Sequence, residues 1–283
     1  MGFRVHPNPS NGIPLGEIPI PKFKMWLMDK LFDLTGKVAL ITGSSSGMGK
    51  AIAEAMGLHG AKVVVSSFDT EGVINTIEDF KKQGIETIGV PCDMSKVEDI
   101  DRLFQTAIST FGKIDILVNC VGMAIPNGFL DINAAVFEKT MALNLQSAIY
   151  LTKLVIPQMV ERNDGAIIYL ASIAGVRGNK SIGLYGISKA GLIQLARNLA
   201  VEFGPHNIRV NSISPGMINT PFSESLMNNA EFMAKRLALT PLRRVGEVEE
   251  IAGVAVMLAS KAGGFMTGQN IIVDGGTVIS DGN

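Results

Sequence analysis

Seven short hydrophobic runs recur along the chain after residue 36, separated by longer segments with a different periodicity. Valine and isoleucine dominate most of these runs, as expected for strands that are buried on both faces of a parallel sheet. The predicted strands are residues 37–42, 61–67, 87–92, 115–119, 166–171, 208–213 and 270–275.

The intervening segments carry hydrophobic residues three and four positions apart, which indicates helices with one buried stripe. Residues 70–83 and 95–111 show this pattern, and Gly112 follows where a C-terminal cap is expected. Ser95 and Glu98 predict a capping box at the start of the second helix. Strands that alternate with helices predict an α/β fold, a doubly wound sheet of seven mainly parallel strands with helices on both faces.

Two predicted helices, residues 188–203 and about 134–160, are apolar around much more than one stripe. A helix that covers only its own sheet should keep a clear polar face. The surplus apolar surface predicts burial against another copy of the chain. We therefore expect a homo-oligomer, a dimer or a tetramer, which light scattering at micromolar concentration can test.

Residues 1–33 form a proline-rich N-terminal extension, and residues 34–283 are expected to form a single domain. Five prolines before residue 22 disfavour a stable helix or a central strand there. We interpret the extension as a tail, or as a start assigned too early, with Met25 or Met28 as the true beginning. Alternatively, the apolar residues between Phe23 and Phe32 anchor the chain to a neighbouring subunit or a membrane surface.

Composition excludes several classes of function. The formal net charge is −1, without a basic block, so nucleic acid is not an expected partner. Cys92 and Cys120 form no CxxC pair, and three histidines give no ligand cluster, so no metal site is expected. The longest apolar stretch, residues 166–176, is too short for a membrane span, and no signal peptide is visible. We expect a cytoplasmic protein.

Tyr185 and Lys189 stand one helical turn apart in the segment YGISK, and Ser172 precedes them in LASIAGV. A tyrosine hydroxyl, with a reference pKa of about 10, is a poor acid or base at neutral pH. A lysine one turn away favours the phenolate and should lower that pKa. A serine hydroxyl can hold a carbonyl or alkoxide oxygen while the tyrosine moves the proton. This arrangement suits interconversion of an alcohol and a ketone, whereas we interpret Tyr150 and Tyr169 as ordinary core or helix residues.

Gly43, Gly47 and Gly49 lie between the first predicted strand and a helical run. Glycine there permits a positive φ and a close approach of backbone to a ligand, and the start of a helix offers unpaired N–H groups to phosphate. The spacing differs from GxGxxG, yet its place between the first strand and the first helix predicts a dinucleotide site.

Together these motifs resemble the short-chain dehydrogenase/reductase family, from about residue 34 to residue 276. The motifs that carry the resemblance are TGSSSGMG at 42–49, Asn119 with Gly122, Asn144, Ser172, Tyr185 with Lys189, PGMINT at 215–220 and VDGG at 273–276. The resemblance implies a Rossmann-type NAD(P)-binding catalytic domain, usually in a tetramer.

The resemblance also implies a role for individual residues. Tyr185 would be the general acid/base, and Ser172 would orient the substrate oxygen. Lys189 would bind the nicotinamide ribose, and Asn144 would hold a water that links this lysine to solvent. Asp93 is implied at the adenine, Asn119 and Gly122 by the adenosine ribose, and Ile218 with Thr220 at the nicotinamide amide. The implied cofactor-binding positions are Gly43, Ser45, Ser46, Gly47, Met48, Ser67, Asp93, Met94, Asn119, Gly122, Tyr185, Lys189, Pro215, Gly216, Ile218 and Thr220.

One position departs from the family pattern, because Val121 stands where alanine is common and adds bulk beside the cofactor's adenosine half. The choice between NAD and NADP depends on the end of the second strand, where an acidic residue favours NAD and an arginine favours NADP. Ser67 and Phe68 are neither, and Asp69 could reach the ribose. The sequence favours NAD slightly.

We therefore expect an NAD(P)-dependent alcohol dehydrogenase or carbonyl reductase that interconverts a secondary alcohol and a ketone. A dehydratase or epimerase of related fold, and a nucleotide-sensing or scaffold protein that has lost its chemistry, are the alternatives. Met123, Ile125, Ile182, Met217, Phe222 and Met227 indicate an apolar or medium-sized substrate. Arg177 could touch an anionic substrate, but we interpret it as an exposed loop residue.

Overall fold

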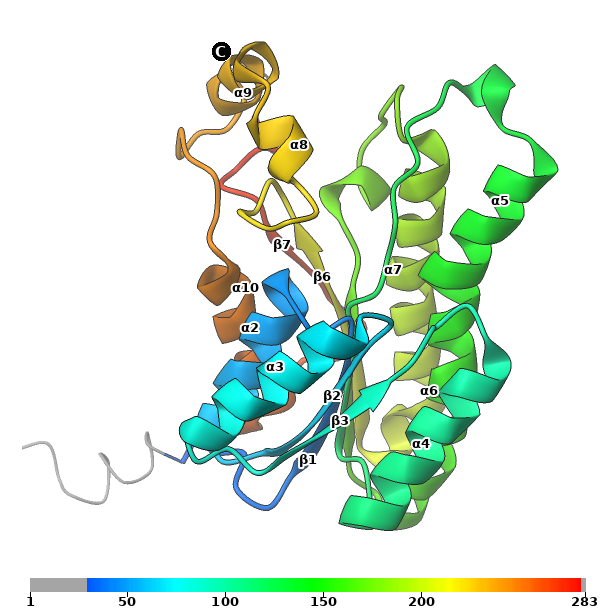
Figure 1. Cartoon of the computed structure of the whole chain (residues 1–283), viewed down its shortest axis with the longest axis vertical. Helices are drawn as coiled ribbons and strands as arrows, with labels where there is room; N and C mark the ends of the chain where they lie inside the picture. The colour runs from blue at the N-terminus through cyan, green and yellow to red at the C-terminus, as the bar shows by residue number, and fades with distance from the viewer. Residues whose placement is uncertain (1–29, 281–283) are drawn as a thin grey trace, which may run out of the picture.

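Seven parallel strands form one sheet, and helices cover both of its faces (Figure 1). The computed structural model describes residues 30–280. The strands are β1 (Val38–Thr42), β2 (Lys62–Ser67), β3 (Thr87–Pro91), β4 (Ile116–Asn119), β5 (Gly165–Leu170), β6 (Ile208–Pro215) and β7 (Asn270–Val273). Their order is β3-β2-β1-β4-β5-β6-β7, and every neighbouring pair is parallel. The predicted Rossmann-type sheet is confirmed, and it is parallel throughout the described residues.

The helices fall into two layers. On one face lie α2 (Gly47–Leu58), α3 (Thr70–Lys82) and α10 (Val248–Ala259), and on the other lie α4 (Val97–Phe111), α6 (Ser147–Arg162) and α7 (Gly183–Phe203). Three further helices, α5 (Ala134–Met141), α8 (Glu224–Met227) and α9 (Ala230–Ala238), lie towards the carboxyl ends of the strands (Figure 1). Short helical turns are η1 (Phe129–Asp131), η2 (Ala142–Gln146), η3 (Ile173–Gly175), η4 (Gly204–His206) and η5 (Lys261–Gly263).

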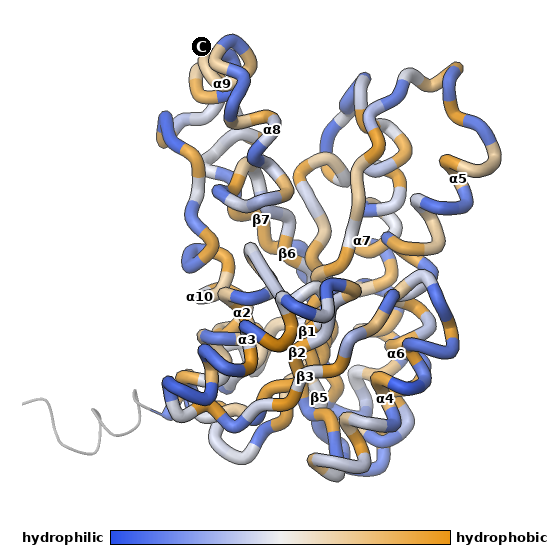
Figure 2. Tube along the Cα trace, in the orientation of Figure 1, coloured by the Kyte–Doolittle hydropathy of each residue, from blue (hydrophilic) through white to orange (hydrophobic). Residues whose placement is uncertain are grey.

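The core lies on both faces of the sheet because side chains alternate along each strand. In β1, Ala39 and Ile41 belong to the buried cluster under α2, α3 and α10, while Val38 and Leu40 belong to the cluster under α4, α6 and α7. β1 and β5 are buried at every position. The central strands carry much of the hydrophobic colour in Figure 2. This two-sided burial explains why the strands appear in the sequence as continuous apolar runs.

Two local features differ from the sequence-based expectation. The predicted helix 134–160 is divided into α5, a π-helical segment at Ala142–Gln146, and α6. The predicted capping box is wrong, because Lys96 occupies the cap of α4 and the Ser95 hydroxyl donates to the carboxylate of Asp93 at 2.7 Å. The predicted cap at Gly112 is confirmed by its left-handed φ of 77°.

The predictions for residues 1–29 lie outside the described residues. Leu34 is buried, and its N–H donates to the carbonyl of His59 at 2.8 Å. Within residues 30–280, no helix combines the length and apolar character needed to span a bilayer, and no cluster of potential metal ligands is found. Three apolar side chains on α6 and α7, Ile149, Ile187 and Val201, are exposed, as an interface with another copy of the chain would require. The homo-oligomer itself stays a prediction.

The approach of α2 to the end of β1 requires glycine at position 49. A Cβ there would lie 2.0 Å from the carbonyl oxygen of Gly43, so the helix would have to move. We expect Gly49→Ala to lower the free energy of unfolding by about 2–3 kcal/mol because it overpacks this contact. Urea unfolding followed by circular dichroism measures the effect.

Gly253→Ala in α10 is the matched control, because no atom lies within 4 Å of the Cβ that it would add. This variant should gain about 0.5–1 kcal/mol from the better helix propensity of alanine. Equal changes in the free energy of unfolding for Gly49→Ala and Gly253→Ala would contradict the steric argument.

Candidate active site

The order of the strands places a crevice at the carboxyl ends of β1 and β4. β2 and β3 continue the sheet on one side of β1, and β5, β6 and β7 continue it beyond β4. At such a reversal the connecting loops separate to opposite faces and leave room for a ligand. The predicted glycine-rich loop follows β1, and residues 119–122 follow β4 into the same crevice. The topology therefore brings the two predicted cofactor segments together.

The glycine-rich loop has the conformation that its glycines permit. Gly43 and Gly47 adopt φ values of 65° and 52°, in the left-handed region that disfavours side chains. Ser46 occupies the N-cap of α2 but makes no side-chain cap hydrogen bond, so the amides of the first turn are open to an anion. A Cβ at Gly43 would lie 3.2 Å from Cγ2 of Val121, so the bulk of this valine is accommodated by the missing side chain.

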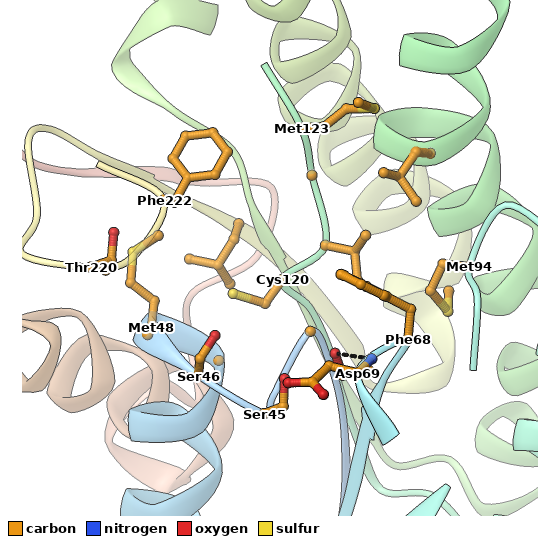
Figure 3. A pocket seen from close by; sticks show the side chains of 18 of the residues that line it. Ser45, Ser46, Met48, Phe68, Asp69, Met94, Cys120, Met123, Thr220 and Phe222 are labelled. Atoms are coloured by element: carbon orange, nitrogen blue, oxygen red, sulfur yellow. Dashed lines mark hydrogen bonds between the residues drawn. The ribbon is translucent and has the colours of Figure 1, made fainter. Parts of the chain in front are cut away.

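A cavity of about 610 Å³ extends along this crevice (Figure 3). This volume lies within the usual range of ligand sites, about 300–1,000 Å³. Figure 3 shows Phe68 and Met94 on one side and Met48, Thr220 and Phe222 on the other. The predicted cofactor residues that line it are Gly43, Ser45, Ser46, Gly47, Met48, Ser67, Asp93, Met94, Gly122, Tyr185, Lys189 and Thr220. We refer to it as the cofactor cavity.

A second cavity, of about 720 Å³, adjoins the first and is lined by Ser172. The predicted residues Pro215, Gly216 and Ile218 also line it. We call it the substrate cavity. Tyr185 lines both cavities, while Lys189 lines only the cofactor cavity. Tyr185 therefore belongs to the wall that two ligand-sized spaces share.

Lys189 and Tyr185 are one turn apart on α7, and both line the cofactor cavity. The lysine is buried, its Nζ donates to the carbonyl of Leu170 at 2.8 Å, and it lies 5.7 Å from the centroid of the Tyr185 ring. A Cβ at Gly122 would lie 2.9 Å from this Nζ, so the loop after β4 approaches the ammonium as closely as glycine allows. The Ser172 hydroxyl accepts a hydrogen bond from the N–H of Ala174 at 3.1 Å, which fixes its position after β5.

Asn119 and Asn144 line neither cavity. Asn144 is buried in the π-helical segment, where its Nδ2 donates to the carbonyl of Met123 at 2.9 Å and to Oγ of Ser188 at 3.0 Å. Its Oδ1 accepts from the Met123 N–H at 2.8 Å. The amide atoms of Asn119 are buried and have no partner among the described residues. Asn144 thus fixes the loop between the two cavities, and the ligand contacts implied for both asparagines stay predictions.

Burial controls the ionisation of the central pair. It lowers the pKa of Lys189 from 10.5 to about 8. Burial also raises the pKa of Tyr185 above its ordinary value, although a hydrogen bond with Ser172 acts in the opposite direction. The prediction that Lys189 brings the tyrosine pKa below its ordinary value is therefore wrong, because burial of the phenolate is the largest influence on this pKa and Lys189 is not among the groups that shift it.

The end of the cofactor cavity beside β2 has no positively charged side chain among its described lining residues. Phe68 is 81% exposed and lines the cavity with Ser67 and Asp69. Oδ1 of Asp69 accepts the N–H of Gly72 at 3.0 Å and caps α3. Lys189, at the opposite end, is the only lysine or arginine among the described residues that line this cavity.

Four of the six residues expected around the substrate line the second cavity: Met123, Ile182, Met217 and Phe222. Ile125 and Met227 do not line it, and Met227 instead receives a weak contact from the Ser223 hydroxyl. The sequence analysis missed Arg236, which lines the cavity from α9. Its helix carries no recognisable motif, so only the folded arrangement identifies this residue.

Comparisons with known proteins agree with this geometry. A family model described as enoyl-(acyl carrier protein) reductase matches residues 43–278. Dehydrogenase/reductase SDR family member 4 of Homo sapiens is 36% identical over 245 residues, which cover 86% of this chain and 88% of that protein. The chain belongs to the short-chain dehydrogenase/reductase family.

Two solved structures of similar proteins show the same fold. A 7α-hydroxysteroid dehydrogenase complexed with NADH and 7-oxo glycochenodeoxycholic acid is 36% identical, with a TM-score of 0.85, covering 90% of this chain and 99% of that chain. A gluconate 5-dehydrogenase from Burkholderia cenocepacia in complex with NADP and tartrate is 27% identical, with a TM-score of 0.86 and coverage of 89% and 99%. The family assignment therefore supports an oxidoreductase that uses a nicotinamide cofactor.

The depressed lysine pKa predicts a pH dependence of stability in this short-chain dehydrogenase/reductase. Below pH 8 both states hold the proton, and burying the charge destabilises the folded state. Between about pH 8 and 10.5 the folded state loses this proton while the unfolded state retains it, so stability should rise with pH. The wild type should gain about 3 kcal/mol over this window relative to Lys189→Met, measured by urea unfolding.

Lys153→Met, at an exposed position of α6, is the control and should give a curve parallel to the wild type. The contributions of all other titrating groups to the pH dependence of stability are common to the wild type and each variant, so they cancel when two curves are subtracted. Parallel curves for the wild type and Lys189→Met would contradict a buried lysine with a lowered pKa.

Proposed function

We propose that this protein catalyses the reversible, NAD(P)-dependent interconversion of a secondary alcohol and a ketone. The observation that carries the proposal is the place of Tyr185, which lines both the cofactor cavity and the substrate cavity. A group in this wall can exchange a proton with a substrate whose reacting carbon faces the cofactor. Ser172 on the substrate side and Lys189 on the cofactor side supply the two groups that this chemistry requires.

The residues of the first cavity fit a dinucleotide. The left-handed glycines and the uncapped first turn of α2 suit a pyrophosphate. Outside the cavity lining, the buried amide of Asn119 has no partner among the described residues and keeps its hydrogen-bonding capacity. When bound, the nicotinamide supplies or accepts the hydride, which no side chain of the chain can do.

In the reductive direction, the residues act in a defined order. The Ser172 hydroxyl donates a hydrogen bond to the substrate carbonyl and holds the oxygen beside Tyr185. The raised pKa keeps the Tyr185 hydroxyl protonated at neutral pH, so it can donate its proton to the developing alkoxide. Lys189 carries a positive charge below about pH 8 and stabilises the phenolate that the transfer leaves behind. Oxidation of the alcohol reverses these steps.

We propose NAD rather than NADP as the preferred cofactor. The end of the cofactor cavity beside β2 offers Ser67, Phe68 and the carboxylate of Asp69, and no cation for a 2′-phosphate. A carboxylate at this end repels that phosphate and can accept a hydrogen bond from a ribose hydroxyl.

Tyr185→Phe removes the proton donor and keeps the ring. We expect turnover of ketones to fall by about 10²–10⁴-fold, because a positioned general acid contributes rate enhancements of that size. Binding of NADH, measured by fluorescence titration, should stay within about twofold of the wild type. Reduction is followed by the loss of absorbance of the reduced nicotinamide.

Tyr150→Phe serves as the control, because Tyr150 lines neither cavity and the substitution removes only a hydroxyl that donates to Asp101 of α4 at 3.0 Å. This variant should retain wild-type turnover. Near-normal turnover of Tyr185→Phe would exclude the tyrosine as the acid. Binding of NADH without turnover of any ketone by the wild type would favour a binding protein without chemistry.

Phe68→Arg places a cation where a 2′-phosphate would lie. We expect the wild type to bind NADH more tightly than NADPH, and we expect the variant to shift this ratio towards NADPH by about tenfold, because a charge-assisted hydrogen bond contributes about that much. Dissociation constants from fluorescence titration measure the ratio without a known substrate.

The matched control is Phe265→Arg. Phe265 is exposed and precedes β7, which lies at the other edge of the sheet from β2 and β3. It should leave the ratio unchanged. A strong preference of the wild type for NADPH would overturn the choice of NAD.

A further inference from the structure

Two arginines face the substrate cavity from segments that are distant in the sequence. Arg177 follows η3, shortly after the catalytic serine, and Arg236 belongs to α9. Both line the cavity that contains Ser172 and Tyr185, and both are half-buried. No aspartate or glutamate is among the described residues that line this cavity. Its charged groups are therefore exclusively cationic.

Neither guanidinium has an anionic partner within residues 30–280. The one hydrogen bond of the Arg177 side chain is a long contact of 3.5 Å to the carbonyl of Thr277. The guanidinium of Arg236 makes no hydrogen bond there and lies 5.6 Å from the ring centroid of Phe232. By contrast, Arg244 is bound to both carboxylate oxygens of Glu250.

The two arginines also affect each other. Burial lowers the pKa of Arg236, and the positive charge of Arg177 lowers it further. Two like charges held near each other in a partly desolvated cavity destabilise the fold unless an anion joins them. A guanidinium presents a planar fork of donors that matches a carboxylate.

The remaining lining determines what kind of molecule would carry the anion. Met123, Ile182, Met217, Phe222 and Leu226 give the cavity that holds the reacting groups and the arginines a largely apolar wall. An apolar segment with an oxyanion at its end complements both parts of this wall.

We propose that Arg177 and Arg236 together bind a carboxylate of the substrate, so that the preferred substrate is an apolar keto acid or hydroxy acid whose reacting carbon is remote from its carboxylate. The inference rests on the proposed alcohol–ketone chemistry and adds the substrate class to it. The arginines position the substrate, while Ser172 and Tyr185 remain the groups that touch the reacting oxygen.

The test uses straight-chain methyl-ketone carboxylic acids of increasing length, from levulinic acid upward, each beside its methyl ester. With NADH, the wild type should reduce the best acid with a kcat/KM about tenfold or more above that of its ester, because the ester lacks the charge that the arginines bind. Arg177→Met and Arg236→Met should each remove most of this preference, because each raises KM for the acid much more than KM for the ester.

Arg197→Met is the matched control, because this arginine of α7 lines neither cavity and, within residues 30–280, donates only to Gln194, at 3.3 Å. It should keep the preference for acids. The melting temperatures of Arg177→Met and Arg236→Met should be equal to or above that of the wild type, since each substitution relieves repulsion between like charges.

Equal kcat/KM for acids and esters in the wild type would overturn the proposal, as would parallel losses for acids and esters in the arginine variants. Calorimetric titration of the same acids and esters in the presence of NADH separates this inference from the proposed function. If no ketone is reduced but acids bind in an arginine-dependent manner, the redox function fails and the anion site stands. If acids and esters are reduced equally, the function stands and the anion site fails.

Discussion

A buried ammonium group needs an acceptor, and the bond from Lys189 to the carbonyl of Leu170 satisfies this need at the centre of the molecule. The bond joins α7 to the end of β5, and the loop after β4 approaches it so closely that position 122 has no room for a Cβ. Asn144 then fixes the next residue of that loop, Met123, through its backbone. These contacts define where the two cavities meet, and Tyr185 occupies that boundary.

The sheet and much of the candidate site could be predicted from sequence because the loops of the site directly follow the buried strands. A parallel strand buried on both faces leaves a continuous apolar run, and its carboxyl end is followed directly by the loop that binds ligands. Gly43 and Gly47 after β1 and Ser172 after β5 are therefore adjacent in sequence to the signals that locate them. Tyr185 and Lys189 are one helical turn apart, so their common face also followed from spacing alone.

Other features depend on contacts that no local pattern records. Ser95 has the sequence of a helix cap, but the neighbouring carboxylate of Asp93 competes for its hydroxyl. Arg236 reaches the substrate cavity only because α9 is carried there by the chain after β6. The pKa of Tyr185 shows the same limit, because spacing places Lys189 nearby but does not reveal the burial of the hydroxyl, which raises this pKa.

The residues that line the two cavities differ in how freely they can be substituted. Met48, Gly122, Met123, Thr220, Tyr185 and Phe222 line both, so a substitution at any of them alters two ligands at once. Leu226, Phe232 and Arg236, on α8 and α9, line only the substrate cavity. Evolution or engineering can therefore exchange these two small helices for new specificity while the cofactor cavity is inherited intact.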